Sequence, residues 1–232
     1  MRYALIMALA ITLVDPAEAQ APERPTSCVL LVTAQYDNCK VINQYQCGSG
    51  ATARLRQETL DINGLFELTT FDQSHGLVFG SLVGSEGRYR LAYTGSTESE
   101  VIAAGSGHRS AQGEFWGAGQ WFPMTVDKLS SFHGEALDLS GKPFHRISNV
   151  VETTLPEPFP DSKGIEVVGF NEEMELTVVL EVREMDENSS NRSMNLVDIS
   201  FAGQQGFGDE KPVYGCDKVS SLPDRPTRGE RT

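Results

Sequence analysis

Alternating hydrophobic and polar positions recur along most of this chain and predict β-strands. The longest regular case spans residues 174–183, where every second residue is apolar and most of the others are polar. Successive side chains of a strand point to opposite faces, so this pattern predicts a long strand with one largely solvated face. Its apolar positions are Met174, Leu176, Val178, Leu180 and Val182.

Three turn signals separate pairs of strand-like stretches. Asn63-Gly64 is typical of a type I′ β-hairpin. Residues 84–87 (Gly-Ser-Glu-Gly) and 140–142 (Ser-Gly-Lys) predict two further hairpins. If Ser140-Gly141 forms a two-residue turn, His145 pairs with Ala136, and if the loop has three residues it pairs with Leu137.

Helical signals are few and short. Thr97 and Glu100 fit a capping box, and Gly105 would end the helix that follows them, although a strand over residues 100–103 competes. Residues 127–132 predict a second, single helical turn. With roughly ten to twelve strands joined by hairpins, the chain is predicted to be all-β. We expect an antiparallel meander forming a barrel, a half-barrel or a sandwich, with at most one or two short helices.

The N-terminus has the features of a secretory signal peptide. Arg2 precedes an apolar stretch from Tyr3 to Val14, and Ala17-Glu18-Ala19 matches an A-x-A cleavage site. We therefore expect a signal peptide at 1–19, a linker at 20–27, one β-rich domain at 28–216 and a polar, disordered tail at 217–232. The apolar stretch is shorter than the ~20 residues that a membrane-spanning helix needs. No later stretch is long enough either, so no membrane span is expected.

The chain is acidic, with a net charge of −13 from 32 acidic and 19 basic residues. Such a charge favours solubility and repels other polyanions. No basic cluster offsets it locally, so nucleic acid is not an expected partner.

Four cysteines remain after the predicted cleavage, at positions 28, 39, 47 and 216. An even number in an exported chain predicts two disulfides, whereas metal sites favour close pairs such as C-x-x-C. If residues 40–46 are a strand, Cys39 and Cys47 lie roughly 26 Å apart and cannot pair. Cys28–Cys39 with Cys47–Cys216 is the preferred arrangement, because Asp37-Asn38 can turn the chain back. Cys28–Cys47 with Cys39–Cys216 is the alternative.

The cysteine framework also resembles that of a group of uncharacterised exported proteins of alphaproteobacteria. The resemblance is carried by Y-D-x-C-x-V from Tyr36 to Val41, by Tyr45 and Cys47, and by Tyr214 and Cys216. It covers only the two ends of the domain. It implies a periplasmic or secreted location and no known activity.

Both tryptophans lie in one aromatic stretch, Phe115–Phe122. Large aromatic residues are usually buried, which favours a core strand whose glycines relieve crowding at a barrel bend. In the alternative interpretation, Trp116, Trp121 and Phe122 form a platform for a sugar ring or an apolar ligand.

Candidate catalytic groups are dispersed. His133 and His145 flank one predicted hairpin, and Glu173 and Glu175 are expected to share a strand face. The motifs of nucleophile elbows, P-loops and zinc proteases are absent.

We therefore predict an exported, non-catalytic protein without cofactor or metal. It would bind an apolar small molecule or a partner protein on a sheet face. The alternatives are a hydrolase that uses dispersed carboxylates with His133 or His145, and a structural component of the cell envelope.

Overall fold

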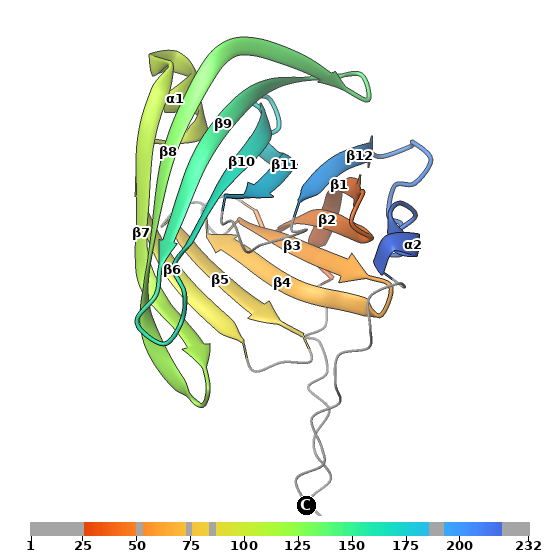
Figure 1. The fold of residues 1–232 in the computed structure, drawn as a ribbon. Coiled ribbons are helices and arrows are strands. Elements are labelled where there is room, and N and C mark those ends of the chain that lie inside the picture. Colours follow the sequence, from red (N-terminus) through yellow and green to blue (C-terminus); the bar gives the residue numbers. More distant parts are fainter. Residues whose placement is uncertain (1–25, 50–52, 73–75, 84–86, 186–192, 220–232) are drawn as a thin grey trace, which may run out of the picture.

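The computed structural model describes residues 26–49, 53–72, 76–83, 87–185 and 193–219, and these residues form a closed antiparallel barrel of twelve strands (Figure 1). The predicted all-β fold is confirmed, and the barrel is the architecture adopted. The predicted signal peptide and residues 220–232 of the predicted tail lie outside the described residues. The strands are β1 (Cys28–Tyr36), β2 (Lys40–Cys47), β3 (Arg54–Asp61), β4 (Gly64–Asp72), β5 (Leu77–Leu82), β6 (Arg88–Gly95), β7 (Ser106–Gly117), β8 (Gln120–Leu139), β9 (Lys142–Thr154), β10 (Ser162–Asn171), β11 (Leu176–Glu184) and β12 (Met194–Ser200).

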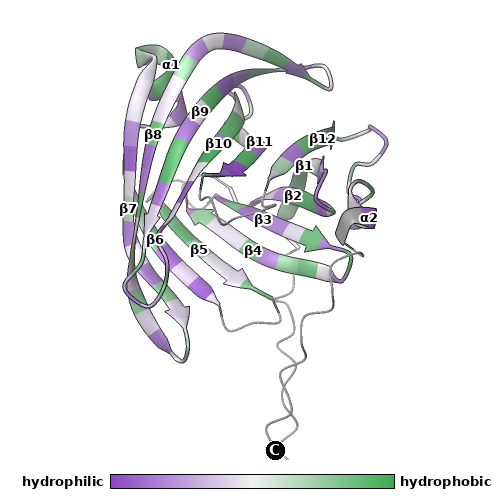
Figure 2. Ribbon diagram, in the orientation of Figure 1, coloured by the Kyte–Doolittle hydropathy of each residue, from purple (hydrophilic) through white to green (hydrophobic). Residues whose placement is uncertain are grey.

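Each strand pairs with the next along the chain, and β1 pairs with β12 to close the barrel. Hydrophilic and hydrophobic residues alternate along many of the strands (Figure 2), as expected where one face points inward and the other outward. The β8–β9 hairpin is the longest and arches over one end of the barrel toward β12 (Figure 1).

Two hairpins turn on a pair of residues that both have positive φ, the conformation that a type I′ turn requires. These pairs are Ala118-Gly119 between β7 and β8, and Ser140-Gly141 between β8 and β9. Of the two registers considered for the second hairpin, the two-residue turn is the one observed, and His145 pairs with Ala136.

The predicted hairpin at Asn63-Gly64 is present, but its type was predicted wrongly. Asp61 pairs with Gly64, so Ile62 and Asn63 form the turn, and only Gly64 has positive φ, at 105°. The carboxylate of Asp61 accepts a hydrogen bond from the backbone N–H of Asn63 at 2.7 Å. This local bond favours an ordinary turn followed by a glycine over the type I′ turn.

The predicted first helix is α1 (Glu98–Ala104), and it has the expected capping box between Thr97 and Glu100. Gly105 ends it in the left-handed conformation. The predicted helical turn at 127–132 is wrong, because these residues lie inside β8: residues 127–131 pair with both β7 and β9, and Phe132 pairs with β9. Strand pairing on both sides stabilises this segment more than one isolated helical turn would. The second helix is instead α2 (Cys216–Val219).

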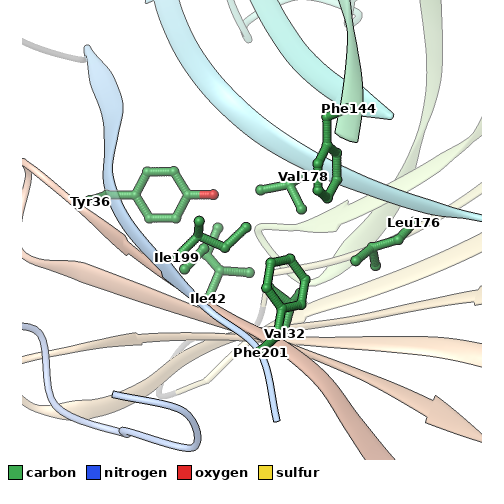
Figure 3. Close-up of a cluster of buried hydrophobic side chains, with 9 residues drawn as sticks. Val32, Tyr36, Ile42, Phe144, Leu176, Val178, Ile199 and Phe201 are labelled. Atoms are coloured by element: carbon green, nitrogen blue, oxygen red, sulfur yellow. The ribbon is translucent and has the colours of Figure 1, made fainter. Parts of the chain in front are cut away.

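The main core forms where the N-terminal half of β11 enters the barrel (Figure 3). Leu176 and Val178 of β11 are buried there against Val32, Ile42 and other apolar side chains of β1, β2 and β12. β11 pairs with β12 at only two positions, so much of this edge of β11 has no neighbouring strand. Side chains take its place: the Tyr36 hydroxyl and Gln44 Nε2 donate to the carbonyl oxygens of Val179 and Thr177.

Residues 201–217, which we call the C-terminal segment, cross the outer face of β1 and β2. Three buried polar side chains of these strands hold it by hydrogen bonds to its backbone: Thr33, Gln35 and Asn43. The polar outer face of β1 and β2 is therefore covered and satisfied. Among the described residues, no helix is both long and apolar enough to cross a membrane.

Candidate functional site: a cleft beside the C-terminal segment

The four cysteines form two disulfides, Cys28–Cys47 and Cys39–Cys216. The preferred pairing was wrong, and the alternative pairing is the one observed. The chain does turn back after Asp37, but that turn joins β1 to β2 and places Cys28 opposite Cys47, with Cα atoms 4.0 Å apart. Cys39 lies at the other end of this hairpin, where it meets Cys216 of α2.

The aromatic stretch is not a core strand but the tip of the β7–β8 hairpin. Trp116 and Trp121 face each other across the hairpin, with ring centroids 5.5 Å apart, and Trp121 is 41% exposed. Phe122 instead contacts Phe159 of the β9–β10 loop, 4.8 Å between centroids. The three predicted ligand residues thus lie on one hairpin, where Phe122 belongs to a separate aromatic contact.

The histidines and carboxylates singled out in the sequence do not form a cleft together. His145 Nε2 lies 4.0 Å from Glu172, beyond hydrogen-bond distance, and Glu173 and Glu175 lie in the β10–β11 turn instead of sharing a strand face. His108 contacts Asp127 at 3.2 Å, but both side chains are more than half exposed. In the described parts of the chain, no group of three or more His, Cys, Asp or Glu side chains is placed to hold a metal ion.

A cavity lies elsewhere, on the outer face of the barrel. It is a cleft of about 690 Å³ between the β3–β4 hairpin and the C-terminal segment. In Figure 1 the turn of this hairpin and α2 lie on the same side of the molecule. We call it the β3 cleft, and its lining residues are Arg56, Glu58, residues 60–65 and residues 210–212.

A buried ion pair lies at the base of the β3 cleft. Arg56 and Glu58 are only 8% and 4% exposed, and Arg56 Nε donates to Glu58 Oε1 at 2.8 Å. The two residues are two positions apart on β3, so both point to the same outer face. Burying a charged pair costs free energy that apolar residues of similar size would not, so its presence in a cleft marks a candidate functional site.

The rim of the cleft adds charges of both signs. Asp61 contributes a carboxylate from the β3–β4 turn, and Glu210 and Lys211 contribute opposite charges from the C-terminal segment. Lys211 is exposed, and its backbone carbonyl accepts a hydrogen bond from Gln35 at 3.2 Å. The backbone of this wall is therefore fixed to β1, and its charged residues line the cleft.

Sequence reasoning missed the β3 cleft. Opposite charges at Arg56 and Glu58, on the same strand face as Leu60, were the available signal. That pattern is also common on solvated strands. The C-terminal segment that covers these residues follows about 150 residues later in the chain, so the sequence does not show the contact.

Comparisons with known proteins give no further guide to this site. No family model matches the chain, and neither a curated protein nor a solved structure matches it significantly.

Proposed function

We propose that this protein is an exported, non-catalytic binding protein that holds a small zwitterionic molecule in the β3 cleft. The observation that carries the proposal is the buried Arg56–Glu58 pair at the base of a cleft of about 690 Å³. That volume falls within the range of small-molecule sites, roughly 300–1,000 Å³.

The charges of the cleft decide the ligand class. Arg56 places a guanidinium in the lining, and a guanidinium attracts carboxylates with planar, directional N–H donors. Lys211 adds a second positive charge at the rim, while the negative charges of Asp61 and Glu210 attract a ligand ammonium group. A ligand with one charge of each sign is attracted by both the basic and the acidic residues of the cleft. An ion of one sign leaves either the basic or the acidic residues without a counter-charge.

Export is supported by the N-terminal sequence, by the cysteine framework and by the two disulfides, which persist in oxidising compartments. A periplasmic or secreted location is part of the proposal. A zwitterionic ligand takes the place of the apolar ligand expected from the sequence, because neither Trp116 nor Trp121 nor Phe122 lines the cleft.

Isothermal titration with four related probes tests the ligand class. L-leucine carries both charges, N-acetyl-L-leucine only the carboxylate, L-leucine amide only the ammonium, and N-acetyl-L-leucine amide neither. We expect L-leucine to bind at least about tenfold more tightly than each of the other three, because removing a charged partner costs ~1.5–3 kcal/mol. Equal binding of the uncharged probe would refute the proposal.

A charge reversal tests the location. Lys211→Glu should weaken L-leucine binding about tenfold, because it places a negative charge beside the ligand carboxylate. Arg88→Glu is the matched control, since Arg88 is also exposed but lies on β6, outside the cleft. If both variants bind as the original protein does, the ligand lies elsewhere.

The exposed tip of the β7–β8 hairpin favours a second candidate function, contact with a partner protein. Trp121 is 41% exposed, and the guanidinium of Arg90 lies over its ring at 4.9 Å. Exposed tryptophan and arginine are the residues that most often dominate protein interfaces. Affinity capture with the original protein and with Trp121→Ala tests this role: a partner retained by both would exclude the tip as its contact.

A further inference from the structure

The β3 cleft is larger than a single amino acid requires. At ~30 Å³ for each water-sized group, its volume of about 690 Å³ holds roughly 23 such groups. A molecule of the size of L-leucine fills less than half of that space, whereas a peptide of two or three residues fills most of it. The volume therefore favours a short peptide over a free amino acid as the zwitterion.

The charges of the cleft are spread along β3. Arg56 and Asp61 both line the cleft and lie five positions apart on this strand. At ~3.3 Å per residue, their Cα atoms are separated by roughly 16 Å. The ammonium and carboxylate groups of a free amino acid are attached to the same carbon atom, whereas an extended tripeptide places them roughly 10 Å apart. A peptide therefore matches the spacing of these charges more closely.

The two walls of the cleft also carry opposite charges. Asp61 belongs to the β3–β4 hairpin, and Lys211 belongs to the C-terminal segment. Within the described part of the chain, no basic side chain pairs with Asp61 and no carboxylate pairs with Lys211. A ligand that extends from one wall to the other, with a charged group at each end, supplies a counter-charge to both residues.

The cleft also has an apolar lining, formed by Leu60, Ile62, Leu65 and Pro212. Ile62 is 54% exposed, although large aliphatic side chains are usually buried. Removing this surface from water is favourable in proportion to its area, so an apolar side chain on the ligand would bind there. Asn63 adds a side-chain amide, which can both donate to and accept from a peptide group.

We infer that the β3 cleft binds a short peptide of about three residues with free termini and an apolar side chain. Its ammonium group is attracted by Asp61, its carboxylate is attracted by Arg56 and Lys211, and its side chain packs on Ile62. This inference rests on the proposed function, because it assigns a chemical class to the zwitterion bound at the same site.

Isothermal titration with three matched probes tests the inference. L-leucine and glycyl-L-leucyl-glycine carry the same side chain and the same two charges, and they differ in the spacing of those charges. We expect the tripeptide to bind at least about tenfold more tightly, because its two ends reach charges that lie far apart. The N-acetylated and C-amidated tripeptide has no charged ends, and it should bind at least about tenfold more weakly than the free tripeptide.

The outcomes separate the inference from the proposed function. If L-leucine binds and the tripeptide binds no more tightly, the inference fails and the proposed function stands. If neither L-leucine nor the tripeptide binds, both fail. Equal binding of the free and the capped tripeptide would also overturn the inference, because it would show that the charged ends are not recognised.

The variant Ile62→Ser tests where the apolar side chain binds. It should weaken binding of glycyl-L-leucyl-glycine about fivefold and leave triglycine binding unchanged, because triglycine has no side chain to pack on Ile62. Phe79→Ser is the matched control, since Phe79 is 48% exposed but lies on β5, outside the cleft. If Ile62→Ser binds the tripeptide as the original protein does, or loses both peptides equally, the inferred contact is wrong.

Discussion

Cys39 and Cys216 lie 177 positions apart in sequence, and their disulfide brings the two Cα atoms to 4.5 Å. The bond joins the start of β2 to the start of α2 and so anchors the end of the C-terminal segment. Residues 210–212 of that segment form one wall of the β3 cleft. A covalent link between distant parts of the chain therefore maintains the proposed ligand site.

Removing this disulfide should abolish ligand binding. Cys39→Ser/Cys216→Ser frees one end of the cleft wall, and we also expect it to lower the free energy of unfolding by about 2–5 kcal/mol. Cys28→Ser/Cys47→Ser is the control, because that disulfide joins two strands that already pair and does not reach the cleft. Calorimetric titration with L-leucine should show binding in the control alone. Retained binding in Cys39→Ser/Cys216→Ser would disprove the structural role of the anchor.

The Arg56–Glu58 pair should show strong coupling in a double-mutant cycle. Glu58→Leu leaves the buried charge of Arg56 without this partner and should cost about 3–5 kcal/mol of stability. Arg56→Met/Glu58→Leu removes both charges, so it should recover most of that loss. Urea unfolding of the original protein, the two single variants Arg56→Met and Glu58→Leu, and the double variant measures the coupling. If the two single-variant costs simply add in the double variant, the residues do not act as a pair.

Tyr36→Phe should destabilise the barrel by about 1–3 kcal/mol, because it leaves the carbonyl oxygen of Val179 unpaired in the interior. In the structure this oxygen accepts from the Tyr36 hydroxyl at 2.9 Å. Tyr214→Phe is the matched control, since the side chain of Tyr214 is 38% exposed. Urea unfolding should separate the two variants by at least ~1 kcal/mol. Equal stability would mean that the edge of β11 does not depend on this bond.

Tyr36 also predicts a loss of stability in alkali. Burial, and then the charge of Glu166, raise the pKa of its hydroxyl well above the ordinary value of 10.0. Above pH 10.0 the phenol therefore ionises in the unfolded chain while it stays neutral in the folded one. The free energy of unfolding should fall as pH rises, by up to ~1.4 kcal/mol per pH unit from this group. Unfolding curves above pH 10.0 should show a shallower decline for Tyr36→Phe, and an identical decline would contradict this assignment.

Local signals in the sequence predicted much of the barrel. The alternation in β11, the Ser140-Gly141 turn and the capping box of Thr97 all act between near neighbours, so they can be found without knowing the fold. The helical turn at 127–132 was predicted wrongly because only local preferences were considered there. The local preference of this segment for a turn is overridden by pairing with two neighbouring strands.

The sites were harder to predict because they depend on contacts that are distant in sequence. The cleft needs Arg56 of β3 and Lys211 of the C-terminal segment. The disulfides show the same limit. The turn after Asp37 was predictable, but the strand register that sets Cys28 opposite Cys47 was not.

Backbone-amide NMR during titration with L-leucine tests the central claim most directly, because it locates the bound ligand on the chain. Binding in the β3 cleft predicts saturable shifts that centre on Ile62, Asn63 and Lys211, on the two walls of the cleft. The same shifts should disappear in Cys39→Ser/Cys216→Ser. Shifts that centre on Trp116 and Trp121, or no saturable shift at any described residue, would contradict the account.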